Sequence, residues 1–174
     1  MSLYEPIAAL PLHIEGYSLD RLARTVSSGF ERVSTVIVLE GGGATGLGED
    51  VTYQAEAHEA QIAAGPIHDL AGQTTFHEFS QRLEQLDLFS GFTPEQTSYR
   101  RYRRWGFESA ALDLALRQAN TSLHDLLGRT AEPVTFVVSS RMGDPPTLAP
   151  VACNPSISSS LQSGVASSLK RMFG

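Results

Sequence analysis

The spacing of apolar residues predicts strands in the first third of the chain. Residues 12–22 mix apolar and polar positions in rough alternation, which is typical of a strand rather than a helix. Residues 33–39 are rich in β-branched side chains and give the clearest strand prediction. Between them, residues 23–30 contain two serines and a glycine and predict a loop. A glycine run then leads to residues 45–49, for which we expect a returning strand.

The middle of the chain changes to a helical pattern. Residues 55–64 favour a helix by propensity, and we expect it to end near Gly65. Thr74 or Thr75 is placed to cap a second helix. The apolar face of that helix repeats every three or four residues, through Phe76, Phe79, Leu83 and Leu86.

The strongest helix prediction covers residues 107–119, and a short helix at 123–127 follows it and stops at Gly128. In the longer helix an apolar stripe is expected, formed by Ala111, Leu112, Ala115 and Leu116. Residues 133–138 predict another strand, too apolar for an open surface. Together these elements predict an α+β fold, with a three-stranded antiparallel meander followed by a helical bundle.

The stretch GGGATGLG contains G-x-G-x-x-G, formed by Gly41, Gly43 and Gly46 directly after a predicted strand. A dinucleotide-binding loop needs a helix to follow, because the helix N-terminus faces the pyrophosphate. Here another glycine and β-branched residues follow instead. We therefore expect a hairpin in which the glycines supply positive φ at the turn.

The composition of the chain argues against nucleic-acid binding and against a membrane span. The chain has 174 residues with 41% apolar residues and a net charge of −6, which argues against a partner bound through nucleic-acid phosphates. Cys153 is the single cysteine and cannot form an internal disulfide, so a reducing, cytoplasmic compartment is expected. No stretch has the ~18 consecutive apolar residues of a membrane span.

Residues able to carry chemistry do not form a recognisable catalytic pattern. His77-Glu78 begins like HExxH, but Gln81 stands where the second histidine is needed. Surface or capping roles are expected for His58, His68 and His77. Cys153 lies in an uncharged neighbourhood that offers no base.

The run YRRYRRW, residues 99–105, combines arginines with aromatic rings, as do some single-strand nucleic-acid sites. In an acidic chain we interpret it as a solvated turn whose arginines pair with nearby carboxylates. Glu108 and Asp113 are five residues apart, so they do not share a helix face as a catalytic pair would.

Three stretches resemble the N-terminal capping domain of the enolase superfamily, in the branch of mandelate racemases, muconate-lactonizing enzymes and dipeptide epimerases. They are VIVLEGGGATGLGEDVTY, FESAALDLALRQANTSLHDLLGR and PVTFVVSSRMGDPPT. The second is the most specific, since it places L-x-x-L-L-G after a helix with Glu108 and Asp113. The resemblance covers about residues 12–148.

The resemblance implies a capping domain over residues 1–132 and a remnant of a first barrel strand over residues 133–148. Residues 149–174 form a serine-rich tail, and no charged residue occurs from Pro145 to Leu169. In that superfamily a (β/α) barrel carries the catalytic lysines and the Mg²⁺ ligands. A barrel takes ~250 residues, and Lys170 is the only lysine here. We therefore expect a truncated relative, inactive alone, with no cofactor of its own and Mg²⁺ only in full-length relatives.

The resemblance also implies substrate-specificity loops between the first two strands and after the third. The positions are Ser27, Ser28, Gly29, Phe30, Asp50, Val51, Thr52 and Tyr53. Ordinary surface loops are the alternative for these positions. Two other hypotheses stay open: a homodimer or a barrel-bearing partner that pairs the strand at 134–138, and a non-enzymatic α+β binding module. Neither nucleic acid nor a membrane is expected as a partner.

Overall fold

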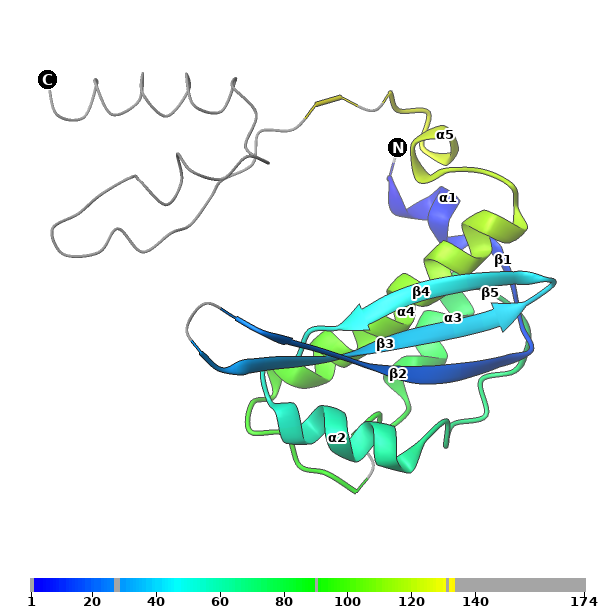
Figure 1. The fold of residues 1–174 in the computed structure, drawn as a ribbon. Coiled ribbons are helices and arrows are strands. Elements are labelled where there is room, and N and C mark those ends of the chain that lie inside the picture. The colour runs from blue at the N-terminus through cyan, green and yellow to red at the C-terminus, as the bar shows by residue number, and fades with distance from the viewer. Residues whose placement is uncertain (1, 27–28, 90, 131, 134–174) are drawn as a thin grey trace, which may run out of the picture. The chain divides into compact units, whose positions relative to one another are not determined.

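The main sheet has three antiparallel strands in the order β2-β3-β4, formed by Gly16–Thr25, Glu31–Gly41 and Ala44–Asp50 (Figure 1). In the register Ile37 lies opposite Leu19 on one side and Gly48 on the other. The computed structural model describes residues 2–26, 29–89, 91–130 and 132–133, and these elements belong to the unit Met1–Ala131. The predicted α+β fold with an antiparallel meander is confirmed.

A second sheet was not predicted. β1, Pro11–Ile14, pairs antiparallel with β5, Gly72–Thr75, so residues 12–22 are not one strand. The chain passes from one sheet to the other at Glu15, whose N–H donates to the carbonyl oxygen of Glu40 at 2.7 Å. Alternation predicts extended backbone but not which partner a strand selects, and for that reason the division was missed.

Five helices lie in the described ranges: α1 Tyr4–Ala8, α2 Ala55–Ala64, α3 Phe76–Glu84, α4 Ser98–Gln118 and α5 Leu123–Leu126. The predicted cap of α3 is confirmed at Thr75. Its hydroxyl accepts from the Glu78 N–H while the Glu78 carboxylate accepts from the Thr75 N–H, which forms a capping box. The helix predicted at 107–119 begins much earlier, at Ser98. The run at 99–105 is therefore helical, and the predicted turn is wrong.

The helices α4 and α2 pack on the main sheet, and Figure 1 shows α4 behind the strands and α2 along their lower side. Ile37 and Leu39 point into this layer and are fully buried. The buried positions of α4 include Ala110, Ala111, Leu114 and Ala115. Of the predicted stripe, Ala111 and Ala115 are buried in the core, and Leu112 and Leu116 are half-buried and pack against its edge.

The glycines serve the hairpin and the helix contact. Gly42 and Gly43, with φ of 57° and 74°, form the turn between β3 and β4, as predicted. Gly46 and Gly48 face α4 so closely that a Cβ would lie 2.2 Å from the Ala110 oxygen and 2.0 Å from the Gly106 oxygen, respectively. The backbones of strand and helix are therefore in direct contact. The hairpin replaces the phosphate-binding loop.

Polar side chains of α4 fix its position along β4. The Asp113 carboxylate accepts from the Leu47 N–H at 3.0 Å, on the free edge of the strand. The Gln118 amide accepts from the His13 N–H and donates to the carbonyl oxygens of His13 and Gly41. The predicted strand at 133–138 and the tail at 149–174 lie outside the described residues.

Candidate functional site

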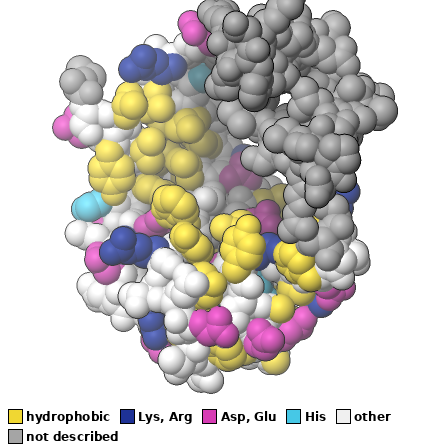
Figure 2. Space-filling view, turned by 90° about the vertical axis from the view of Figure 1, so that its left-hand side faces the viewer, with side chains coloured by type: hydrophobic (Ala, Val, Ile, Leu, Met, Phe, Trp, Pro, Cys, Tyr) yellow, Lys and Arg dark blue, Asp and Glu magenta, His cyan; other side chains and the backbone are white. Residues whose placement is uncertain are grey.

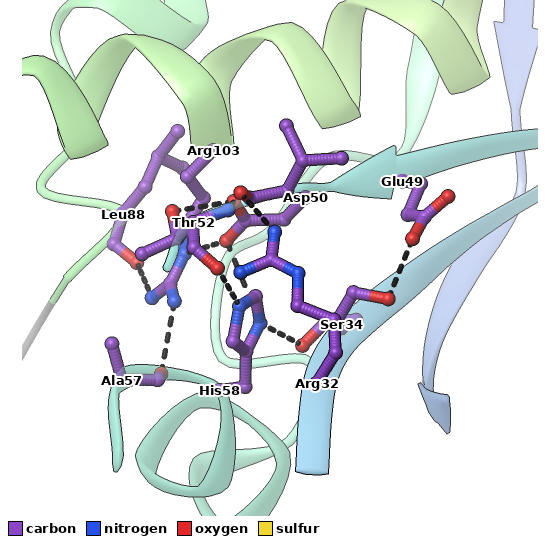
Figure 3. Close-up of polar contacts among 11 residues, drawn as sticks. Arg32, Ser34, Glu49, Asp50, Thr52, Ala57, His58, Leu88 and Arg103 are labelled. Atoms are coloured by element: carbon purple, nitrogen blue, oxygen red, sulfur yellow. Dashed lines mark hydrogen bonds and ion pairs between the residues drawn. The ribbon is translucent and has the colours of Figure 1, made fainter. Parts of the chain in front are cut away.

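A buried ion pair joins α4 to the end of β4 (Figure 3). The Arg103 Nε donates to the Asp50 Oδ2 at 2.7 Å, and both side chains are nearly or fully buried. The remaining guanidinium nitrogens donate to the carbonyl oxygens of Leu88 and Ala57, at 3.2 and 2.9 Å. The guanidinium also lies 3.7 Å from the ring centre of Phe89. All three nitrogens of this buried cation are thus engaged.

Burial and the neighbouring carboxylate change the pKa of the Arg103 guanidinium in opposite directions. Burial lowers the pKa of the Arg103 guanidinium, and the charge and hydrogen bond of Asp50 oppose that change. Because an arginine keeps its proton in proteins, the group remains a cation and needs Asp50 as its counter-ion. The pair is therefore a fixed structural link between helix and strand.

Two hydroxyls and an imidazole extend the cluster. Asp50 Oδ1 accepts from the N–H and the hydroxyl of Thr52, at 3.0 and 2.7 Å. His58 on α2 contacts the Thr52 carbonyl oxygen through Nε2 and the Thr35 hydroxyl through Nδ1, both at 2.9 Å. A carbonyl only accepts, so Nε2 carries the proton. His58 is fully buried, and the predicted surface role is wrong.

At the end of β4 and in the loop after it, residues 50–53 are alternately buried and exposed. Asp50 and Thr52 point inward and are fully buried, whereas Val51 and Tyr53 are 40% and 72% exposed. Arg32 holds this loop from outside. Its Nη2 donates to the Val51 carbonyl oxygen, and its guanidinium lies 3.9 Å from the centre of the Tyr53 ring. The loop is thereby fixed on both sides.

The other predicted loop lies at the same end of the sheet, because β2 ends and β3 begins where β4 ends. Phe30 is 51% exposed, and Gly29 has a positive φ of 85°. Ser27 and Ser28 lie outside the described residues. We call Phe30, Val51 and Tyr53 the end-loop surface. Figure 2 looks at the molecule from this end and shows exposed hydrophobic side chains between charged ones.

The structure thus divides the predicted loop residues into two groups. Val51, Tyr53 and Phe30 are exposed, whereas Asp50 and Thr52 are buried and hydrogen-bonded. The arginine run was misjudged in one respect: Arg103 is buried instead of solvated. The expected pairing is confirmed for Arg100 with Asp87, for Arg103 with Asp50 and for Arg104 with Glu108.

The described residues around Asp50 do not fit a Mg²⁺ site. Both oxygens of Asp50 are occupied, by Arg103 and Thr52, and a guanidinium next to a carboxylate repels a cation. The neighbouring Glu49 carboxylate accepts from the Ser34 hydroxyl at 2.6 Å. Within the described ranges, no group of three His, Cys, Asp or Glu side chains is arranged to hold a metal ion.

Two shallow hollows occur elsewhere on the described surface. The larger, of about 350 Å³, lies between the end of α4 and α5, and a smaller one of about 250 Å³ lies between β1, β5 and α4. The amide of Gln118 lines the second but is already bonded to the backbone of His13 and Gly41.

Comparison with known proteins places residues 5–126 in a single family. A family model described as "Domain of unknown function (DUF8230) N-terminal domain" matches these residues. No curated protein and no solved structure matches the chain. Among the helices of the described residues, none has the length and apolar character to cross a membrane. The chain therefore belongs to the DUF8230 family, through its N-terminal domain.

Proposed function

We propose that residues 5–126 form an accessory domain that closes over the active site of a second domain through the end-loop surface. The observation that carries this proposal is the alternation at residues 50–53. Buried bonds from Arg103 to the Asp50 carboxylate and from His58 to the Thr52 carbonyl oxygen hold this segment, while Val51 and Tyr53 remain exposed. A surface that is ordered before binding loses little conformational entropy when a partner docks, so it binds more tightly.

Two further points support the proposal. The family model is described as an N-terminal domain, which implies a following part in that family. The resemblance to capping domains of the enolase superfamily assigns these same loops to substrate selection. In this proposal the second domain supplies Mg²⁺ and the base for proton abstraction next to a carboxylate. The accessory domain contributes the surface that closes the site.

A reducing, cytoplasmic location is part of the same proposal, since one cysteine cannot form an internal disulfide. A homodimer is the competing arrangement. The end-loop surface favours a different second domain, because its exposed side chains sit at one end of the sheet rather than along a broad face.

The first test is activity. The purified 174-residue chain is incubated with Mg²⁺ and a panel of dipeptides and other α-carboxylates, and deuterium exchange at the α-carbon is followed by mass spectrometry. We expect no exchange above the rate without protein. Turnover by this chain would contradict an accessory role.

The second test is binding. The region that follows the N-terminal domain in a family member is titrated with this chain in a calorimeter. We expect Tyr53→Ala to weaken binding at least tenfold, because exposed aromatic side chains dominate interface energies. Tyr4→Ala is the matched control, since Tyr4 is an exposed aromatic residue on α1, at the other end of the molecule. Equal affinities for the two variants would overturn the role of the end-loop surface.

A further inference from the structure

The outward face of α4 carries a row of side chains that is apolar except at its centre. Tyr102, Trp105, Ser109, Leu112 and Leu116 follow one another at spacings of three, four, three and four residues. This is the spacing of the a and d positions that contact a partner helix in coiled coils. The buried face toward the sheet includes Arg103, Gly106, Ala110 and Leu114. We call the outward row the α4 seam.

The α4 seam is partly exposed in the described part of the molecule. Trp105 is 65% exposed and Ser109 is also exposed. Tyr102, Leu112 and Leu116 are half-buried, and each packs with one side against a buried core cluster. A tryptophan this exposed is unusual, since tryptophan is highly buried on average. Its indole is also held in place: it stacks on Tyr102 at 6.4 Å between ring centres and 22° between planes. Tyr102 in turn contacts the buried Tyr99 ring at 6.0 Å.

We propose that the α4 seam is the docking surface for an amphipathic helix of the following domain. The spacing selects the secondary structure of the occupant, because alternating three- and four-residue steps interlock with the side chains of another helix and not with a strand. The exposed indole of Trp105 gives the contact an aromatic anchor of the kind that dominates binding energies.

Ser109 shapes the middle of the seam. It is the one polar member of the row, and it is small, whereas Trp105 and Leu112 on either side of it are large. A small side chain between two large ones leaves a depression that a leucine of the partner helix can fill, in the manner of a knob entering a hole. The serine hydroxyl can keep a hydrogen bond within its own helix, to a backbone oxygen one turn earlier, when the partner excludes water.

Charge next to the seam specifies the chemistry of that helix. Arg101 lies one turn before Trp105 on the same face and is exposed. Arg100, Arg103 and Arg104 each pair with a carboxylate, whereas Arg101 has no ion pair with any described residue. An acidic residue beside the apolar row of the partner helix therefore complements this site.

The length of the seam favours a linked domain over a free second copy. From Tyr102 to Leu116 the helix rises ~21 Å, at ~1.5 Å per residue. A single helix pair of this length is at the small end of stable interfaces. Covalent linkage compensates for a small interface by raising the effective concentration. The inference thus rests on the proposed function for the existence of a following domain, but its surface is separate from the end-loop surface.

Fluorescence offers a direct test, because Trp105 is the only tryptophan in the chain. The 174-residue chain is titrated with a synthetic helical peptide, about 21 residues long to match the ~21 Å seam with a turn to spare at each end. The peptide has leucines at alternating three- and four-residue spacing and glutamates beside them. A peptide of the same composition, with its leucines distributed around the helix, is the control ligand. We expect saturable binding of the first peptide, with a blue shift of the tryptophan emission, and at least tenfold weaker binding of the second.

Two matched variants test whether the change in Trp105 emission reports binding at the α4 seam. Ser109→Glu puts a charge and a long side chain in the middle of the row at an exposed position, and we expect it to weaken peptide binding at least tenfold. Ala63→Glu introduces the same side chain at an exposed position of α2, away from the row, and should leave binding unchanged. Circular dichroism and a urea titration check that both variants remain folded.

Four results would overturn the inference. They are a Trp105 protected from acrylamide in the free chain, no shift at millimolar peptide, equal binding by the two variants, and a dimer in sedimentation that Ser109→Glu dissociates. The last would make a second copy the occupant. Equal binding by Tyr53→Ala and Tyr4→Ala would contradict the proposed function, whereas peptide capture by the seam does not involve Tyr53. Failure of the proposed function and failure of this inference are therefore distinguishable.

Discussion

Arg103 shows how one residue can connect its own helix to three other segments of the chain. Its guanidinium bonds to Asp50 at the end of β4, to the Ala57 carbonyl oxygen on α2 and to Leu88 after α3. An arginine at a core position interrupts the apolar spacing by which a buried helix face is recognised in a sequence. For that reason the sequence pattern predicted a solvated turn where α4 has its first two turns.

Asp50→Asn removes the counter-ion and leaves the Arg103 cation buried. We expect a loss of about 3–5 kcal/mol in the free energy of unfolding, the usual cost of breaking a buried pair from one side. Urea denaturation followed by circular dichroism measures the loss. Asp87→Asn is the control, because Asp87 pairs with Arg100 at the surface and should cost at most about 1 kcal/mol. Similar losses in the two variants would show that burial does not decide the effect.

At the scale of elements, the sequence predicts those features that depend only on neighbouring residues. The capping box at Thr75 and the glycine turn between β3 and β4 could both be predicted, since each depends on a few neighbouring residues. His58 bonds to Thr35 and Thr52, which lie in other segments of the fold. No spacing along the chain indicates these two partners. In the candidate site, the loops were located from the resemblance, but the division into buried and exposed side chains required the fold.

Gly48→Ala tests the backbone contact between β4 and α4. A methyl group there would lie 2.0 Å from the Gly106 oxygen, so strand or helix must shift. We expect a loss of about 1–3 kcal/mol in the free energy of unfolding, as for other overpacked cores. Gly16→Ala has no atom within 4 Å of the added carbon and should be neutral or slightly stabilising. A neutral Gly48→Ala would contradict the close approach.

The capping box of α3 makes a prediction about pH. Hydrogen bonds from the Thr75 N–H, and then from the Thr75 and Thr74 hydroxyls, lower the pKa of the Glu78 carboxyl below its ordinary 4.5. A lowered pKa adds stability above the unfolded value, and that stability is lost as pH falls through the folded pKa. We therefore expect the stability difference between the wild type and Glu78→Gln to shrink on acidification from about pH 6 to about pH 3, a range that spans the ordinary carboxyl pKa. Thermal unfolding at several pH values measures it, and a difference independent of pH would contradict the assignment.

At the scale of the whole molecule, the described residues form an α+β unit with a buried polar cluster around Arg103 and Asp50, and this unit exposes two apolar surfaces. The end-loop surface and the α4 seam belong to different elements, so one partner domain can use both or two partners can use one each. Sequence patterns indicated the fold class and the meander. They did not indicate the α4 seam, because the predicted stripe mixed residues of the inner and outer faces of the helix.

A shortened chain ending at Pro133 tests whether this unit is self-sufficient. Every described helix and strand lies before that residue. We expect a single thermal transition with a midpoint within about 2 °C of that of the 174-residue chain, since ~1 kcal/mol shifts the midpoint of a domain this size by several degrees. A larger fall would show that residues after Pro133 contribute to its core.

The close approach of the β4 and α4 backbones at the glycines also affects how the helix is held in place. The glycines at positions 46, 48 and 106 bring the two backbones close together, with few side chains between them. Three polar attachments, at Arg103, Asp113 and Gln118, help to set the register of the helix. If they are weakened, the helix gains freedom to move along its axis while remaining packed on the sheet. Trp105 would move together with the helix. The polar bonds between α4 and the sheet therefore determine the position of the α4 seam.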